Sequence, residues 1–351
     1  MEIESLPVPE GYEEVKLGRD TASGMTAIVA IHNTNIGPAL GGTRFLNYPS
    51  QADALEDVLR LAHGMTYKSA IAGLNYGGGK CVLLGDPSKP KTEEQMLALG
   101  RFVNSFEGRY ITTEDMNMAI EDLEIVRRES RHVCGLLSSP HSSGHPGLYT
   151  AHGVFHGLLA AVRHQLGRSD DLTGLRICVQ GLGSVGGALV EKLHAAGAEL
   201  LLADINTRRA EELAERFGCE TFDTHRAHAA DVDVFSPCAR GAGLNSKTIG
   251  EISARVIAGC ANNQLDTPGD DDLLWRAGIL YAPDYVINCG GVVAVSFEIE
   301  ESTMTREERM ASVERTDPIL TQIFERARSE NIATGRISNA IAEERFLASA
   351  A

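Results

Sequence analysis

Hydrophobic and polar residues alternate along the first third of the chain in the way that an α/β domain requires. Residues 25–33 are rich in β-branched side chains and predict a strand, and residues 81–86 predict a short buried strand that ends before two prolines. Residues 50–65 and 92–106 instead place apolar side chains at helical spacing, each behind a serine or threonine that we expect as the N-cap. Alternating strands and helices predict an α/β fold.

The pattern changes after residues 136–147, where Ser, Pro, Gly and His gather without periodicity and predict a loop or hinge. Residues 150–166 are again helical. The run LRICVQ, GLGSVG, GALVEKLHAAG and AELLLAD then predicts a strand–turn–helix–strand unit of a parallel sheet. We expect further strands within 232–237, 254–259 and 279–288, followed by two C-terminal helices.

Composition limits the functions that such a fold can carry. The net charge of −16 argues against a nucleic-acid partner, which needs a basic surface. No apolar run reaches the roughly 18–20 residues of a membrane span, and the acidic N-terminus lacks the apolar core of a signal peptide. The seven scattered cysteines form no CxxC pair. We therefore expect reduced thiols in a cytoplasmic protein, with no disulfide framework and no metal site.

The segment ICVQGLGSVGG places Gly181, Gly183 and Gly186 directly after a strand and at the start of a helix. The first glycine permits a tight turn, the second lets a pyrophosphate approach the backbone, and the third lets the helix pack closely. Asp204 ends the next strand, 18 residues beyond Gly186. A carboxylate there accepts hydrogen bonds from ribose hydroxyls and repels a 2′-phosphate, so the pattern predicts NAD rather than NADP.

Two observations keep other interpretations of this segment open. A glycine-rich turn of a doubly wound fold need not bind a dinucleotide. Arg208 and Arg209 also lie close to the expected ribose site and weaken the preference for NAD.

Two lysines stand in GMTYKSAIAGLNYGGGK, within a stretch that has no carboxylate between Asp57 and Asp86. Lys68 and Lys80 are therefore without an acidic neighbour in sequence. Apolar surroundings lower the pKa of a lysine toward that of a working base, and a second cation lowers it further. Two such amines would suit an anionic substrate, one binding a carboxylate and the other exchanging protons. Equally, both lysines could snorkel, with hydrated ammonium groups.

Asp115 follows a short expected strand in GRYITTEDMN. A carboxylate at this position could balance the lysines and take a proton from an amine. It would equally suit the N-cap of a helix formed by DMNMAIEDLEIVRRE. The residues alone leave both interpretations open.

Six segments together resemble one enzyme family: GPALGGTRF, GMTYKSAIAGLNYGGGK, GRYITTED, VQGLGSVG, IAGCANNQL and ILYAPDYVINCGGV. They follow one another in unbroken order from about residue 20 to 300 and are similar to the amino-acid dehydrogenases of glutamate, leucine, phenylalanine and valine, most of all to the leucine/valine branch. The resemblance implies NAD-dependent, reversible oxidative deamination of an apolar L-amino acid by a homo-oligomer. The net charge and the absence of a long apolar run, given above, are the grounds on which we expect no nucleic-acid and no membrane partner.

The same resemblance implies a two-domain α/β fold with a cleft between the domains. We expect residues 1–137 with 325–351 to form an α/β domain that binds the substrate, carries the catalytic residues and mediates oligomerisation. Residues 138–324 should form a doubly wound Rossmann domain that binds NAD.

The resemblance also assigns roles to individual positions. It implies that Lys68 binds the substrate carboxylate, that Lys80 is a low-pKa base that activates water, and that Asp115 exchanges protons with the amine. The other implied substrate-binding residues are Leu40, Gly41, Gly42, Met65, Thr113, Cys134, Asn262, Val292 and Val295. The implied cofactor-binding residues are Thr150, Gly181, Gly183, Ser184, Val185, Gly186, Asp204, Ile205, Cys238, Ala239, Asn262 and Asn288.

Leu40 and Val295 bear on the class of side chain that the pocket accepts. The resemblance places a lysine and a hydroxyl at these positions in a glutamate enzyme. A glutamate γ-carboxylate buried against Leu40 and Val295 would stay unpaired, which costs several kcal/mol, so we expect an apolar substrate. Because one methylene changes selectivity by only about 1–3 kcal/mol, the choice between aliphatic and aromatic side chains stays open.

Four residues depart from the family pattern and leave the exact substrate open as well: Arg240, Cys289, Glu300 and Glu301. Of these, Cys289 should lie near the nicotinamide. Two other functions compete with the amino-acid dehydrogenase. An amine dehydrogenase would not need Lys68, and a non-catalytic NAD-binding protein would not need Lys80 together with Asp115.

Overall fold

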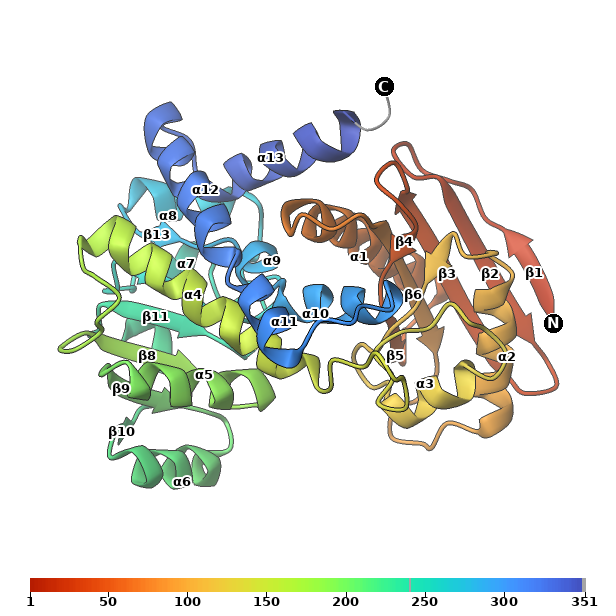
Figure 1. Cartoon of the computed structure of the whole chain (residues 1–351), viewed down its shortest axis with the longest axis horizontal. Helices are drawn as coiled ribbons and strands as arrows, with labels where there is room; N and C mark the ends of the chain where they lie inside the picture. Colours follow the sequence, from red (N-terminus) through yellow and green to blue (C-terminus); the bar gives the residue numbers. More distant parts are fainter. Residues whose placement is uncertain (240, 349–351) are drawn as a thin grey trace. The chain divides into compact units, whose positions relative to one another are not determined.

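The structure is a computed structural model that describes residues 1–239 and 241–348, and it contains two compact units. The first unit comprises Met1–Gly144, Val295–Thr303 and the C-terminal residues from Ala342 on. The second comprises His145–Ala294 and Met304–Ile341. Each unit has its own sheet and its own helices (Figure 1), so the expected two-domain α/β fold is confirmed.

The first unit is built on a seven-stranded mixed sheet with the order β1-β2-β3-β6-β4-β7, in which β5 also pairs with β6. Its strands are β1 (Glu2–Ser5), β2 (Glu14–Asp20), β3 (Met25–Asn33), β4 (Ala39–Leu40), β5 (Thr43–Leu46), β6 (Gly77–Leu84) and β7 (Tyr110–Ile111). β2, β3 and β6 are antiparallel, whereas β4 and β5 run parallel to β6 and β7 runs parallel to β4. The parallel part of the sheet therefore brings three distant segments of the chain side by side.

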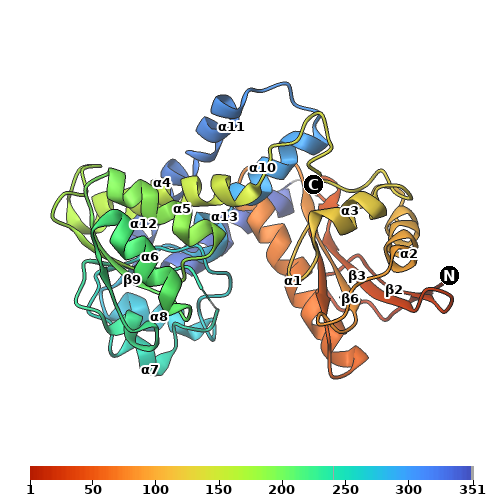
Figure 2. The ribbon, with the colours of Figure 1, turned by 90° about the horizontal axis from the view of Figure 1, so that it is seen from below.

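Helices cover both faces of this sheet, and the alternation of side chains along β3 shows why. Ile28 and Ala30 pack with apolar residues of α1, whereas Val29 and Ile31 point to the other face and pack with residues of α2. Figure 2 shows α1 and α2 on opposite sides of the strands. The helices of this unit are α1 (Gln51–Ile71), α2 (Glu93–Asn104), α3 (Ile120–Val126), the second half of α10 (Gly290–Ile299) and the end of α13 (Thr334–Ala348).

The second unit contains a parallel six-stranded sheet with the order β10-β9-β8-β11-β12-β13. Its strands are β8 (Arg176–Gln180), β9 (Glu199–Ala203), β10 (Glu220–Thr221), β11 (Val234–Pro237), β12 (Val256–Ile257) and β13 (Leu280–Tyr281). The chain proceeds outward from β8 to β10 on one side and from β11 to β13 on the other. This is the strand order of the Rossmann fold, and ligands of such sheets bind at the carboxyl ends of the strands where the order reverses, here between β8 and β11.

Helices and one 3₁₀ turn surround this parallel sheet. They are α4 (Pro146–Leu166), α5 (Ser184–Ala195), α6 (Thr207–Phe217), the 3₁₀ helix Thr224–Ala229, α7 (Ser246–Ile249), α8 (Gly269–Arg276), α9 (Asp284–Ile287), the start of α10, α11 (Arg306–Val313), α12 (Thr316–Glu330) and most of α13 (Thr334–Ala348). α4 packs against α5 and α12 (Figure 1). Among the described residues, no helix combines the length and apolar character that crossing a bilayer requires.

The local predictions for strand 25–33 and for the N-caps Ser50 and Thr92 are confirmed. Three others were wrong in extent. Helix α1 continues to Ile71, because its buried face continues through its last turn, so Lys68 lies inside the helix rather than after it. Lys80 likewise lies within β6 rather than before the strand.

The third difference concerns the segment 279–288. Only Leu280–Tyr281 forms a strand there, and residues 284–287 form the short helix α9. Pro283 precedes this helix and has no N–H group with which to continue the ladder, so the strand ends before it.

The unit boundaries also differ from the expected residue ranges. α12 and the start of α13 pack within the second unit, where Arg163 pairs with Asp317 and the Thr334 hydroxyl donates to the Tyr281 carbonyl at 2.7 Å. Residues 295–303 belong instead to the first unit. α10 and α13 thus each contribute residues to both units.

Candidate functional site

Lys80 lies in the interior of β6, directly after three glycines, and only 5% of its surface is exposed. Its Nζ atom lies 3.2 Å from Oδ2 of Asp115. Asp115 reaches this position because the preceding residue, Glu114, forms a parallel bridge with Thr43 at the start of β5, which is itself paired with β6. The sheet therefore supplies the partner that the local sequence around Lys80 does not contain.

Arg44 is a second cation on the same carboxylate. Its Nε donates to Asp115 Oδ2 at 2.8 Å, and its Nη1 donates to Asp57 Oδ2 at 3.2 Å. The Asp57 carboxylate also accepts from the Tyr48 hydroxyl at 2.7 Å and from Arg60 Nη2 at 2.8 Å. The sequence reasoning missed Arg44, although it lies in the quoted segment GPALGGTRF, two residues after a pair of glycines.

The helix-cap interpretation of Asp115 was wrong. Helix α3 begins at Ile120 with Ala119 as its N-cap, and the Asp115 side chain is held by Lys80 and Arg44 instead.

The electrostatics of this group make an acid–base pair. Burial lowers the pKa of Lys80, Asp115 opposes that shift, and Arg44 adds to it, so the pKa stays below its ordinary value. Burial raises the pKa of Asp115, but the attraction of Lys80 and Arg44 outweighs burial and leaves this pKa below its ordinary value. Asp115 is thus an anion at neutral pH, and it lies beside a lysine whose pKa is lowered from its ordinary value.

Glycines let the backbone close around this pair. A Cβ atom at Gly41 would lie 1.8 Å from the Gly79 carbonyl oxygen, and one at Gly42 would lie 2.3 Å from the Glu114 carbonyl oxygen and 2.9 Å from Asp115 Cβ. No side chain fits at either position without moving the backbone that carries Lys80 or Asp115.

Lys68 is half-buried in the last turn of α1, one turn beyond Met65 and on the same face of the helix. The Met65 side chain lies 3.3 Å from the position that a Cβ atom would occupy at Gly41. α1 therefore turns the face that carries Met65 toward the glycine pair.

Three predicted pocket residues of the first unit also come together. The Thr112 carbonyl accepts from the Cys134 backbone N–H at 2.9 Å, which places Cys134 beside the strand end that carries Thr113. A Cβ atom on Gly135 would lie 2.7 Å from Thr113 Oγ1 and 3.8 Å from Val295 Cγ1. Thr113 Oγ1 is buried, and its side-chain contact with the Cys134 thiol lowers the pKa of that thiol, whereas burial raises it more.

Glu298 is a residue of this region that sequence reasoning missed. It lies one turn after Val295 on α10 and is 9% exposed. Its carboxylate accepts from the backbone N–H groups of Gly135 at 2.9 Å and Leu136 at 3.2 Å. Burial raises the pKa of Glu298, and these backbone donors oppose the shift. Glu298 thus fixes the segment after Cys134; its signal in the sequence was an acid within the apolar helix GGVVAVSFEI.

The predicted glycine turn of the second unit adopts the expected geometry. Gly181 has φ +96°, in the left-handed region. A Cβ atom at Gly186 would lie 2.0 Å from the Gly181 carbonyl oxygen, whereas one at Gly183 would meet nothing within 4 Å. Gly183 is also the N-cap of α5 and has no side chain to satisfy its N–H groups. An anionic ligand therefore has open backbone and a helix N-terminus at this position.

Asp204 lies against the same turn. Its Oδ2 accepts from the Leu182 N–H at 2.6 Å and its Oδ1 from the Asn206 N–H at 2.8 Å. Arg209 donates from Nε to the Leu182 carbonyl, and Arg208 pairs with Glu212 at 2.8 Å. Both arginines near the expected ribose site are therefore engaged with protein groups.

The other predicted cofactor residues gather at the carboxyl ends of the strands. The Cys238 N–H donates to the last residue of β8 at 2.7 Å, and Ala239 Cβ would lie 2.7 Å from a Cβ atom at Gly181. Ser184 and Val185 form the first turn of α5, and Ile205 is 85% exposed beyond Asp204.

Asn288 and Asn262 form a second group at this end of the sheet. Asn288 Nδ2 donates to Asn262 Oδ1 at 2.8 Å and to the Cys260 carbonyl at 3.1 Å. Asn288 Oδ1 is buried and has no hydrogen-bond partner. This acceptor suits the amide group of a nicotinamide. Thr150 lies beside the start of α10: its Oγ1 is 2.9 Å from the position that a Cβ atom would occupy at Gly291, three residues after Asn288.

Four positions remain to be placed. Leu40 is fully buried in β4, and Val292 is buried on the first half of α10. Cys289 is buried with its Sγ 3.8 Å from Thr316 Oγ1, so its thiol faces α12. Arg240 lies outside the described residues.

A cavity of about 240 Å³ opens beside β8 and β11 and includes none of the predicted site residues. Its lining is mostly polar and includes Gln180, His225, His228, Asn245 and Gln264.

The sequence of the chain matches two family profiles. One, described as "Glu/Leu/Phe/Val dehydrogenase, dimerisation domain", matches residues 10–132, and the other, "Glutamate/Leucine/Phenylalanine/Valine dehydrogenase", matches residues 199–350. The chain is also 45% identical over 335 residues to the leucine dehydrogenase of Geobacillus stearothermophilus, an alignment that covers 95% of this chain and 90% of that protein. The chain belongs to the Glu/Leu/Phe/Val dehydrogenase family.

Other relatives extend the likeness beyond leucine dehydrogenases. The phenylalanine dehydrogenase of Thermoactinomyces intermedius is 43% identical over 96% of this chain and 92% of its own length. The crystal structure of L-tryptophan dehydrogenase from Nostoc punctiforme has a TM-score of 0.85 at 38% identity and covers 97% of both chains. The chain is therefore an oxidoreductase of a family of NAD(P)-dependent amino-acid dehydrogenases.

Proposed function

We propose that this chain catalyses the reversible, NAD-dependent oxidative deamination of an apolar L-amino acid to its 2-oxo acid and ammonia. The observation that carries the proposal is the buried contact between Lys80 and Asp115, 3.2 Å apart, in a chain of this family. Such a pair supplies both a base with a lowered pKa and an anion that accepts a proton from an ammonium group.

In this proposal Lys68 binds the substrate carboxylate as a point charge. Asp115 takes a proton from the substrate ammonium group, so that the neutral amine can give up the hydride on Cα. The bound nicotinamide supplies the hydride acceptor. Lys80, as the free amine, then removes a proton from the water that adds to the imine carbon. The protonated Lys80 gives its proton to the carbinolamine nitrogen and takes the hydroxyl proton as the C–N bond breaks, which leaves the 2-oxo acid and ammonia. Asp115 passes its proton to the departing ammonia and Lys80 releases its proton to solvent, so both groups return to their starting states.

NAD fits the residues of the second unit. The open backbone at Gly183 and the N-terminus of α5 suit the pyrophosphate, and the unpaired Asn288 Oδ1 suits the nicotinamide amide. Asp204 lies where it would accept from the ribose and repel a 2′-phosphate. Arg209 already binds the Leu182 carbonyl, whereas the exposed Arg208 pairs only with Glu212, so the preference for NAD depends on Asp204.

An apolar substrate side chain follows from Leu40 and Val295, which are both buried and would leave a second carboxylate unpaired. We favour a branched aliphatic substrate such as L-leucine or L-valine, with L-phenylalanine next. The match to a dimerisation domain supports a homo-oligomer, and the free state of all seven cysteines supports a cytoplasmic location.

An initial-rate panel of L-amino acids with NAD and with NADP tests this function. We expect NADH formation with L-leucine or another apolar amino acid, with 2-oxo acid and ammonia formed in equal amounts, and lower efficiency with NADP and with L-glutamate. Isopentylamine, which is L-leucine without its carboxylate, is the matched control and should be a poor substrate. Activity on the amine but not on the amino acid would replace the proposal with an amine dehydrogenase, and NADH binding without turnover of any substrate would indicate a non-catalytic protein.

A further inference from the structure

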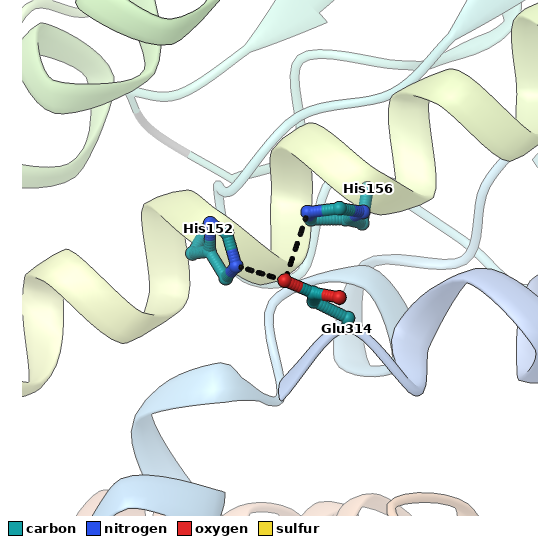
Figure 3. A group of neighbouring side chains, drawn as sticks. All are labelled: His152, His156 and Glu314. Atoms are coloured by element: carbon teal, nitrogen blue, oxygen red, sulfur yellow. Dashed lines mark hydrogen bonds and ion pairs between the residues drawn. The ribbon is translucent and has the colours of Figure 1, made fainter. Parts of the chain in front are cut away.

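Two histidines and a glutamate of the second unit form a cluster that the proposed reaction does not use. His152 and His156 lie one turn apart on α4, and Glu314 follows the last turn of α11 as its C-cap. Glu314 Oε1 lies 3.1 Å from His152 Nε2 and 3.7 Å from His156 Nε2, and one ligand atom from each residue lies within 4.8 Å of the others (Figure 3). The cysteine pattern predicted no metal site, and that pattern carries no information about His152, His156 and Glu314.

The donor set and its spacing suit a divalent transition metal. Two imidazoles and one carboxylate, with room for water, are a common ligand set for Zn²⁺. With metal–ligand distances of about 2.0–2.2 Å, the ligand atoms of a tetrahedral site lie about 3.4 Å apart. The two distances to Glu314 lie on either side of this value. The Glu314 side chain is 47% exposed and free to rotate, while the ligand atoms, which lie within 4.8 Å of one another, have to come closer on metal binding.

The backbone that carries the three ligands is held firmly. A Cβ atom at Gly153 would lie 3.0 Å from Val313 Cγ1 and 3.2 Å from Thr316 Oγ1, so α4 packs closely against the junction of α11 and α12. The two histidine rings meet edge to face with centroids 4.6 Å apart. The three ligands therefore come from helix segments that pack closely against each other.

Lys192 on α5 works against metal binding. Its Nζ lies 3.1 Å from His152 Nδ1, and an ammonium group can only donate there. His152 then carries its proton on Nε2 and donates it to Glu314. A metal on Nε2 needs the proton on Nδ1 instead, where the Lys192 ammonium offers no acceptor. Lys192 must therefore swing away when a metal binds.

We propose that His152, His156 and Glu314 form a Zn²⁺ site that joins α4 to the α11–α12 junction, and that Lys192 limits its affinity. The site is structural: none of its residues belongs to the proposed substrate or cofactor set. A bound ion would stabilise the native second unit by RT ln(1 + c/Kd), where c is the free Zn²⁺ concentration, so the stabilisation rises with the logarithm of this concentration once it exceeds Kd.

The test uses the untagged full-length chain, stripped of metal and titrated with Zn²⁺ by calorimetry and with Co²⁺ by its visible absorption. We expect one ion per chain and a rise in the thermal unfolding midpoint with Zn²⁺. His156→Ala and Glu314→Gln should each weaken binding by about tenfold or more. His194→Ala is the matched control, because His194 is an exposed histidine on α5, and it should leave the affinity unchanged. Lys192→Met should tighten binding.

Three results would overturn the proposal. The first is that the parent chain shows no saturable binding at Zn²⁺ or Co²⁺ concentrations up to about 1 mM. A site weaker than this would add little to the stability of the fold. The second is binding that His156→Ala and Glu314→Gln leave unchanged, which would place the ion elsewhere, for example on thiols. The third is weaker binding in Lys192→Met, which would contradict the part assigned to Lys192.

Discussion

Replacing Asp115 by asparagine tests whether two opposing neighbours set the pKa of Lys80. Asp115 raises this pKa, whereas burial and Arg44 lower it. The substitution keeps the size of the side chain and removes the larger of the two carboxylate influences that raise the pKa, the other being Asp57. The pKa of Lys80 should therefore fall further, and the lysine should become a free base at lower pH.

The size of the change follows from the 3.2 Å contact between Lys80 Nζ and Asp115 Oδ2. Two unit charges at this distance attract by about 1.3 kcal/mol in bulk water and by about 5 kcal/mol at an effective dielectric constant of about 20, which corresponds to about 1 to 4 pK units. Arg44 shares the same carboxylate oxygen and neutralises part of its charge. We therefore expect a fall of about 1–2 units, in the lower half of that range.

The assay is the pH dependence of kcat/KM for L-leucine at saturating NAD, whose acidic limb reports the free-enzyme base. In Asp115→Asn the limb should move to lower pH, even though the rate itself falls. Arg44→Met is the paired variant: it removes a cation, so its limb should move to higher pH, and Arg44→Lys should keep the limb near that of the parent. NADH affinity and circular dichroism serve as controls for folding. Limbs that stay in place, or that move in the same direction in Asp115→Asn and Arg44→Met, would refute the reasoning.

Three further predictions concern the second unit. Asp204→Asn keeps an oxygen for the Leu182 N–H but removes the charge, so the ratio of kcat/KM for NAD over NADP should fall by about tenfold, or about 1.4 kcal/mol; an unchanged ratio would show that Asp204 does not select the cofactor. Asn288→Ala removes the unpaired buried acceptor and should weaken NADH binding in a fluorescence titration by about tenfold, as for one lost hydrogen bond, and equal affinity would exclude this contact. Burial raises the pKa of Asp271 to about 6, so the native state holds its proton more tightly and loses stability as the pH rises from about 4 through 6. Asp271→Asn should therefore raise the free energy of unfolding in urea by up to about 3 kcal/mol near pH 8 and change it little near pH 4, and an equal effect at both pH values would contradict this assignment.

The sequence predicted the local elements well where hydrophobic periodicity and caps agree. Ser50 and Thr92 cap helices as expected, since a hydroxyl oxygen before a periodic apolar run satisfies the first free N–H groups. The glycine turn before α5 was equally predictable, because a side chain at Gly181 or Gly186 would clash with neighbouring atoms and one at Gly183 would occupy the space that a ligand needs.

Partners far apart in the sequence were harder to predict from the residues. Lys80 and Asp115 meet only because β4, β5 and β7 add parallel to β6 and its neighbours, a pairing that no local pattern specifies. The family resemblance named the pair but not Arg44, which shares the Asp115 carboxylate. Arg44 was missed because the sequence around an arginine does not show which distant acid the side chain will contact.

The boundaries of the compact units differ from the expected residue ranges for another physical reason. α10 and α13 each run through a boundary between the compact units, and helix periodicity does not change where the packing partner changes. Glu298 was missed because the sequence shows only an acid near the end of an apolar helix. The sequence does not show that its carboxylate accepts from the backbone N–H groups of Gly135 and Leu136, about 160 positions earlier.

The central claim is that the amine of Lys80 is the base of an amino-acid deamination. The most direct test is the steady-state rate of NADH formation from L-leucine by Lys80→Met, in which a side chain of similar length replaces the amine. The account predicts a loss of about 10²–10⁴-fold in kcat, the range for general acid–base catalysis, with NADH affinity unchanged. A rate within a few-fold of the parent chain, with NADH still bound normally, would contradict it.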